Sequence, residues 1–168
     1  MELRDCPMKD HLIKEFEIRV FDESYVRIKK CLNLLRDEQI WSAPNDKITS
    51  IGNTTLHLIG NARQWILTGI GESSDERNRD DEFKEESKIS KDELLTMLED
   101  LKTDLMPVLK GLSENQINKV TSVQNFEVSG FSIVIHVIEH FSYHTGQISI
   151  LTKLMINEDL GYYADHDL

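Results

Sequence analysis

Apolar residues recur at steps of mostly three and four in four long stretches of this sequence, and this spacing constrains the fold more than any other feature. A helix turns about 100° per residue, so such steps return to one face, whereas a half-buried strand would alternate. The sequence therefore predicts four long amphipathic helices. They cover residues 7–37, 50–69, 90–111 and a last stretch from Ser129 or Ser132 to about Ile156.

The predicted helix ends carry local signals. Thr49 or Ser50 offers a hydroxyl that can cap the exposed amides of the second helix. Ser90 and Glu93 form a capping box at the start of the third helix. Pro107 is expected to bend that helix, because a proline inside a helix removes one hydrogen bond and crowds the preceding turn.

The connections between the predicted helices differ in character. Residues 72–83 are strongly polar and lack apolar rhythm, which predicts a long loop. A loop of this length is either a functional cover or a solvated crossover, and Phe83 would anchor it to the body. Signals are mixed over residues 113–130. A single helical turn from Ser113 and a short extended piece within 120–128 are compatible with them, and most of this segment is expected to be loop.

The composition limits the class of protein. A chain of 168 residues suits a single domain, here 1–168, with one core. The net charge of −11 argues against nucleic acid as a partner, because phosphate backbones are bound by basic faces. No window approaches the roughly 18 consecutive apolar residues that cross a bilayer. We therefore expect a cytoplasmic protein that does not bind membranes. The two cysteines are too few for a disulfide framework.

Three of the six histidines lie in the fourth predicted helix, each four residues from the next. Because a step of four returns to nearly the same side, His140 and His144 stack on one face and can direct a ring nitrogen at one metal ion. His136 lies about 80° round from His144, too far to share that ion comfortably. A stable site needs a third ligand. His57, amid the apolar residues of the second helix, supplies it if the two helices are neighbours with these levels aligned, which sequence alone does not establish.

Two segments resemble a known family. Residues 136–148, with the two stacked histidines followed by Thr145, Gly146 and Gln147, look like the last-helix signature of the DinB-like superfamily, which includes the bacillithiol transferases. Residues 51–66 resemble that family's second helix, with its single histidine. The resemblance implies an all-α four-helix bundle of the DinB/YfiT-like type with long inter-helix connections, often a homodimer. It also implies a divalent metal ion held by three histidines, here His57, His140 and His144.

Other polar residues near these histidines are candidates for supporting roles. Gln147 lies one turn from His144 and can accept a hydrogen bond from the second nitrogen of a ligand ring, which metal-bound histidines usually donate. Glu139, Asn53 and Asn61 are weaker candidates for the same role. His136 is expected to form a wall of the pocket or to support a ligand ring.

Three neutral imidazoles would leave a metal ion its full charge and an open position, so that a bound water or thiol becomes more acidic. Four hypotheses follow: a transferase that activates a low-molecular-weight thiol, as the resemblance suggests, a hydrolase that uses metal-bound hydroxide, a non-catalytic metal- or ligand-binding bundle, and a helical interaction protein without metal. The ion is zinc, nickel or iron, among which the ligand type does not choose. The substrate would be a small molecule, and no residue is assigned as catalytic.

Overall fold

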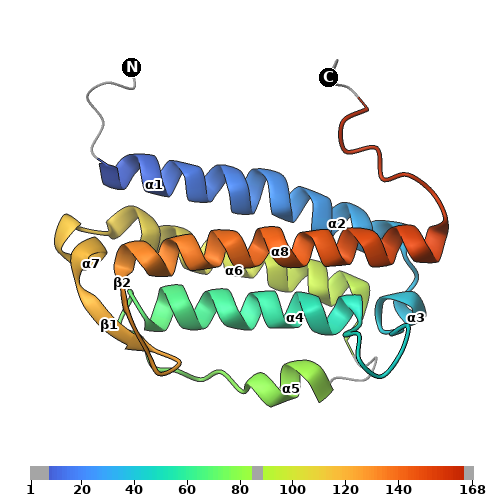
Figure 1. Cartoon of the computed structure of the whole chain (residues 1–168), viewed down its shortest axis with the longest axis horizontal. Helices are drawn as coiled ribbons and strands as arrows, with labels where there is room; N and C mark the ends of the chain where they lie inside the picture. Colours follow the sequence, from blue (N-terminus) through green and yellow to red (C-terminus); the bar gives the residue numbers. More distant parts are fainter. Residues whose placement is uncertain (1–7, 85–88, 165–168) are drawn as a thin grey trace.

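Four long helical segments packed side by side form the protein in the computed structural model, which describes residues 8–84 and 89–164 (Figure 1). Two of them contain a π-helical stretch, labelled η. The segments are α1 (Met8–Phe16) continued by η2 (Glu17–Ser24) and α2 (Tyr25–Leu34), α4 (Ile51–Ala62) continued by η3 (Arg63–Thr68), α6 (Lys91–Gly111) and α8 (Gly130–Ile156).

These segments confirm the four predicted helices and their capping signals. The Ser50 side chain accepts a hydrogen bond from the Asn53 amide, and Ser90 and Glu93 form the predicted capping box. The helix α6 continues through Pro107 to its predicted end. The first segment ends at Leu34, three residues before the predicted end, because Leu35 has extended backbone angles. A separate short helix, α3 (Asp37–Ile40), follows.

The helix α4 lies deep in the bundle, which explains why its sequence is almost free of charge. It packs against α8, α6 and the short helix α5 (Arg79–Lys84). Every residue from Ile51 to Ile59 is buried. From the other side of the bundle, α6 contributes five fully buried leucines at steps of three and four, namely Leu94, Leu98, Leu101, Leu105 and Leu109. Burial of such side chains stabilises the fold by about 1.5–3 kcal/mol each.

The segment before α8 forms a β-hairpin that the sequence predicted only in part. After α7 (Glu114–Asn118), the strand β1 (Val120–Val123) pairs with β2 (Phe126–Ser129) in antiparallel register. The predicted single helical turn corresponds to α7, and the predicted extended piece corresponds to the strands. The expectation that most of the segment is loop was wrong, because both strands are short and largely exposed and so lack the alternation of a half-buried sheet.

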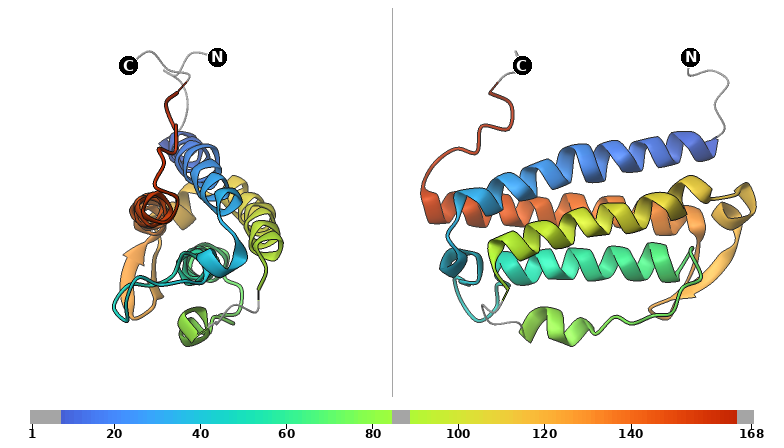
Figure 2. Two further views of the ribbon diagram at one scale, coloured as in Figure 1. Left: turned by 90° about the vertical axis from the view of Figure 1, so that its right-hand side faces the viewer. Right: turned by 180° about the vertical axis from the view of Figure 1, so that it is seen from behind.

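The polar segment after α4 is not a loop throughout, and the prediction of one was wrong for residues 79–84. These residues form α5, which lies on the outer side of α4 (Figure 2). The sequence of α5 shows no apolar pattern because its buried residue is Glu82, so the face that α5 turns toward the bundle is acidic. Residues 85–88 are outside the described part of the chain.

None of the helices formed by the described residues combines the length and the apolar character needed to cross a membrane.

Candidate metal centre

Three imidazoles converge between α4 and α8. His57 lies in the middle of α4, and its Nε2 is 3.0 Å from Nε2 of His140 on α8. With His144, one turn further along α8, these rings offer three donor nitrogens that all lie within 4.8 Å of one another. Nitrogens bound to one tetrahedral zinc ion at about 2 Å are roughly 3.3 Å apart, so small side-chain movements suffice to bind an ion. The structure therefore shows that α4 and α8 are neighbours with these histidines at the same level, which the sequence alone did not establish.

Burial favours the neutral form of His140 and His144. Desolvation, together with the smaller effects of the neighbouring charges of His144 and His57, lowers the pKa of His140 to about 3. The pKa of His144 is also lowered by burial, although its hydrogen bond with Gln147 opposes this. A neutral imidazole is the form that binds a metal ion, so protons compete weakly for the nitrogens of His140 and His144 at neutral pH.

The second nitrogen of His57 is held by a buried ion pair. Its Nδ1 lies 3.0 Å from Oε2 of Glu82 on α5. Arg77 donates two hydrogen bonds to the same carboxylate, from Nε at 2.6 Å and from Nη2 at 2.8 Å. Burial alone would raise the pKa of Glu82, but the hydrogen bonds from Arg77 and His57 outweigh it and hold that pKa below its usual value. Nη2 of Arg77 also lies 3.1 Å from Nδ1 of His57. The ionised carboxylate of Glu82 favours a proton on Nδ1, and in that tautomer the lone pair of Nε2 is free for a metal ion.

Gly60 makes this arrangement sterically feasible. A Cβ atom at this position would lie 2.0 Å from Oε1 of Glu82, far inside contact distance. Asn53 fixes α5 from the same helix face, since its Nδ2 donates to the backbone oxygen of Glu82 at 2.9 Å. Glu82 and Arg77 were not predicted from the sequence, because both lie in a run of charged residues with no periodicity. A glycine three residues after the helical histidine was the available signal.

Gln147 contacts the ring of His144, which it is predicted to support. Its Oε1 is 2.7 Å from Nδ1 of His144, so the ring can donate there and present Nε2 to an ion. The weaker candidates Glu139 and Asn61 lie in different environments. Glu139 is exposed, and Oδ1 of Asn61 is buried without a hydrogen-bond partner among the described residues.

His136 stands outside the group of three donors. Its ring stacks on Trp65 with centroids 3.7 Å apart and lies nearly parallel to His140 at 5.3 Å. Its Nε2 is buried without a hydrogen-bond partner in the described structure, and burial lowers its pKa. The ring therefore packs against a candidate ligand and limits its rotation.

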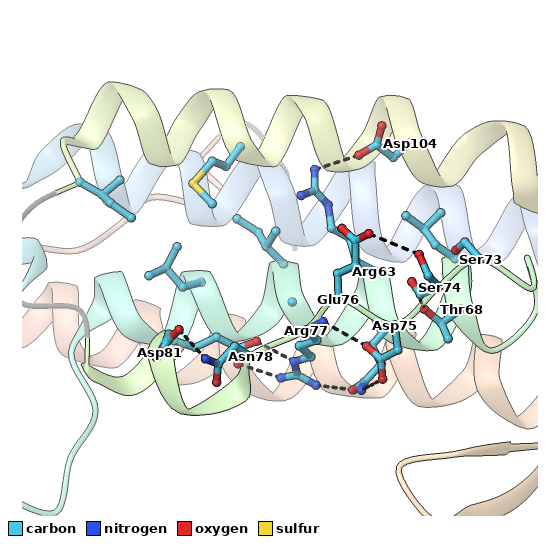
Figure 3. A pocket seen from close by; sticks show the side chains of 18 residues that line it. Arg63, Thr68, Ser73, Ser74, Asp75, Glu76, Arg77, Asn78, Asp81 and Asp104 are labelled. Atoms are coloured by element: carbon cyan, nitrogen blue, oxygen red, sulfur yellow. Dashed lines mark hydrogen bonds and ion pairs between the residues drawn. The ribbon is translucent and has the colours of Figure 1, made fainter.

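Two cavities flank the chain of contacts from Arg77 to His57. The first, of about 540 Å³, is lined by His57 and His144 and will be called the histidine cavity. The second, of about 630 Å³, lies between α4, α6 and the segment that precedes α5 (Figure 3). The two arginines that line the second cavity are paired: Arg63 donates to Asp104 at 2.8 Å, as Figure 3 shows, and Arg77 donates to Glu82. Of these two cavities, the histidine cavity is the one whose described lining includes candidate metal ligands.

Comparisons with known proteins agree with this fold. Residues 11–163 match a family model described as "Protein of unknown function (DUF1572)". The crystal structure of a DinB-like protein from Bacillus cereus has a TM-score of 0.66 and 16% sequence identity, covering 84% of this chain and 91% of that chain. That of a conserved protein from Enterococcus faecalis has a TM-score of 0.69 and 15% identity, covering 90% and 98%. A search of curated proteins finds no match. These similarities confirm the DinB-like helical bundle that the sequence resemblance implied.

Proposed function

The chain belongs to the DUF1572 family, whose fold is DinB-like, and on this premise we propose that it binds a divalent metal ion through His57, His140 and His144 and activates a small thiol for transfer to an electrophile. The observation that carries the proposal is the convergence of three imidazoles, two of which have their second nitrogen held by Glu82 and Gln147. This donor set suits zinc, nickel or iron.

A divalent ion held by neutral ligands retains its charge and lowers the pKa of a thiol or water in its open position. The protein's own residues orient the ligand rings and line the space in which the two reactants meet. In the transfer itself, the thiol sulfur forms a bond to the electrophilic carbon, the leaving group departs with the bonding electrons, and the thiol proton passes to solvent.

The lining of the histidine cavity favours a thiol over water as the nucleophile. Asp and Glu are absent from its described lining, so these residues offer no carboxylate as a general base. Hydrolysis by a three-ligand metal site is commonly assisted by such a base, whereas a thiol needs only to lose its own proton. A metal-dependent hydrolase remains the alternative enzyme.

Metal analysis tests the binding part of the proposal. Untagged protein, loaded with zinc and freed of excess ion, should retain about one equivalent of metal, and His57→Ala should retain less than roughly a tenth. His11→Ala is the matched control, because His11 lies on α1 outside the group of three donors, and it should retain the wild-type amount. If the wild-type protein retains no ion and a chelator does not change its melting temperature, the remaining hypothesis is a helical interaction protein without metal.

Turnover tests the catalytic part. Zinc-loaded protein should accelerate the reaction of a low-molecular-weight thiol with a chromogenic alkyl halide, and His140→Ala should lose this acceleration together with the metal. Stoichiometric binding without turnover of any electrophile tested would instead support a non-catalytic metal- or ligand-binding bundle. A homodimer in the cytoplasm remains our prediction for the assembly and its location, and sedimentation analysis tests the former.

A further inference from the structure

The histidine cavity carries positive charge in a protein whose net charge is −11. Apart from its histidines, the ionisable side chains in its described lining are Lys47, Arg79 and Tyr143. An anionic group that entered this cavity would therefore meet two cations and no carboxylate from its walls. The net negative charge of the protein repels anions, so the positive charge in the lining is a local feature of this cavity.

These two cations are available to a ligand. The carboxylates of α5 are occupied elsewhere: Asp80 lies 3.6 Å from Lys84, Asp81 accepts from Asn78, and Glu82 is held by Arg77 and His57. The guanidinium of Arg79 lies over the ring of Phe83, with its carbon 5.0 Å from the ring centroid. Within the described residues, neither Arg79 nor Lys47 forms an ion pair.

The remaining walls are mostly apolar. Hydrocarbon surface in the lining comes from Ile48, Phe83, Ile150 and Leu151. Phe83 also contacts the site directly, because its ring centroid is 5.1 Å from that of His57. A ligand that fills this space thus needs an apolar body as well as polar ends.

We propose that the histidine cavity takes a thiol whose apolar body ends in an anionic group, a carboxylate or a phosphate, held by Lys47 and Arg79. The inference rests on the proposed function, since it places the sulfur at the three histidines. The guanidinium fork of Arg79 suits the two oxygens of such a group, and the Lys47 ammonium adds a point charge. The second cavity does not fit this ligand, because its arginines are already paired with Asp104 and Glu82.

A matched pair of thiols tests the proposal. Cobalt-loaded protein is titrated with 6-mercaptohexanoate and with 6-mercaptohexanol, which share a thiol and an apolar chain and differ in charge at the far end. The sulfur-to-cobalt charge-transfer absorption reports binding of the thiol. At low ionic strength we expect the carboxylate to bind roughly fivefold to tenfold more tightly than the alcohol, and added salt to reduce this difference. A phosphonate analogue binding more tightly still would identify a dianion as the preferred end group.

Variants locate the source of the preference. In the double variant Lys47→Gln/Arg79→Gln, the two thiols should bind equally, while affinity for the alcohol stays near the wild-type value. Lys84→Gln is the matched control, because it removes a cation from the same helix α5 outside the cavity, and it should keep the preference. Each single variant is also titrated, so that a folding defect in the double variant does not decide the result.

The possible failures are distinguishable. Equal affinity of the wild-type protein for both thiols overturns the anionic substrate and leaves thiol activation standing. If neither thiol produces the charge-transfer absorption although cobalt is bound, the proposed function itself fails. A preference that persists in the double variant assigns it to residues other than Lys47 and Arg79 and also overturns the inference.

Discussion

Glu82 is the residue through which α5 acts on the candidate metal site. In Glu82→Gln the side chain keeps its shape and loses its charge, so His57 loses the carboxylate that favours a proton on Nδ1. Metal affinity should fall about 10- to 100-fold, the usual effect of removing a hydrogen-bond partner of a ligand. A competitive titration against a zinc-binding chromophore measures it.

A neighbouring carboxylate provides the control for that experiment. Asp81→Asn makes the same chemical change on the same helix, at a residue whose side chain accepts a hydrogen bond from Asn78. It should leave metal affinity unchanged. Wild-type affinity in Glu82→Gln would show that His57 is oriented without help from α5.

Gly60 gives a second prediction at this scale. In Gly60→Ala the added methyl group would occupy the position of the Glu82 carboxylate, so α5 must shift away from α4. We expect weaker metal binding and faster proteolytic cleavage between residues 72 and 84. Gly146→Ala is the control, because its Cβ would meet no atom within 4 Å. This control should stabilise α8 by about 0.5–1 kcal/mol, and the same stabilisation without loss of metal in Gly60→Ala would contradict the prediction.

Some site residues could be predicted from the sequence and others could not, for a physical reason. His140 and His144 share one helix, so their geometry follows from the helical repeat alone. The place of His57 depends on how two helices pack, and the resemblance rather than the spacing supplied it. Glu82 and Arg77 reach His57 from a segment without apolar periodicity, so nothing local marked them among the other charged residues.

Among the elements, α6 depends on its capping box. Ser90→Ala removes the hydroxyl that accepts from the Glu93 amide, and it should destabilise the protein by about 1 kcal/mol in urea unfolding. Thr96→Ala, at an exposed position inside the same helix, should instead stabilise slightly, because alanine has the higher helix propensity. Equal effects of both changes would show that the cap adds nothing to stability.

The helices were predictable where burial requires apolar residues at helical spacing. α4, α6 and α8 bury continuous apolar stripes, and their ends carry hydroxyl caps that the sequence displays. The hairpin of β1 and β2 and the helix α5 bury few side chains, so their backbone conformation leaves little trace in the apolar pattern.

At the scale of the whole molecule, a bound ion would join two of the four helical segments. Metal present at 100 times its dissociation constant stabilises the folded state by about 2.7 kcal/mol. For a chain of this size, removal of the ion by a chelator should lower Tm by roughly 5–11 °C. Calorimetry measures the shift, and His57→Ala should melt at the same temperature with and without chelator. A wild-type Tm that does not respond to the chelator would exclude a metal that links α4 to α8.

The helix α8 packs along two of the other long helical segments, the one that begins with α1 and the one that begins with α4, whereas α5 packs against α4. Backbone amides in the middle of α8 should therefore exchange with deuterated solvent only when the entire molecule opens, and those of α5 should exchange through local opening. The two rates separate two routes of metal release. If the ion slows exchange in α8 but not in α5, the outer helix opens while the ion stays bound. If it slows both equally, the ion leaves only when the whole fold opens.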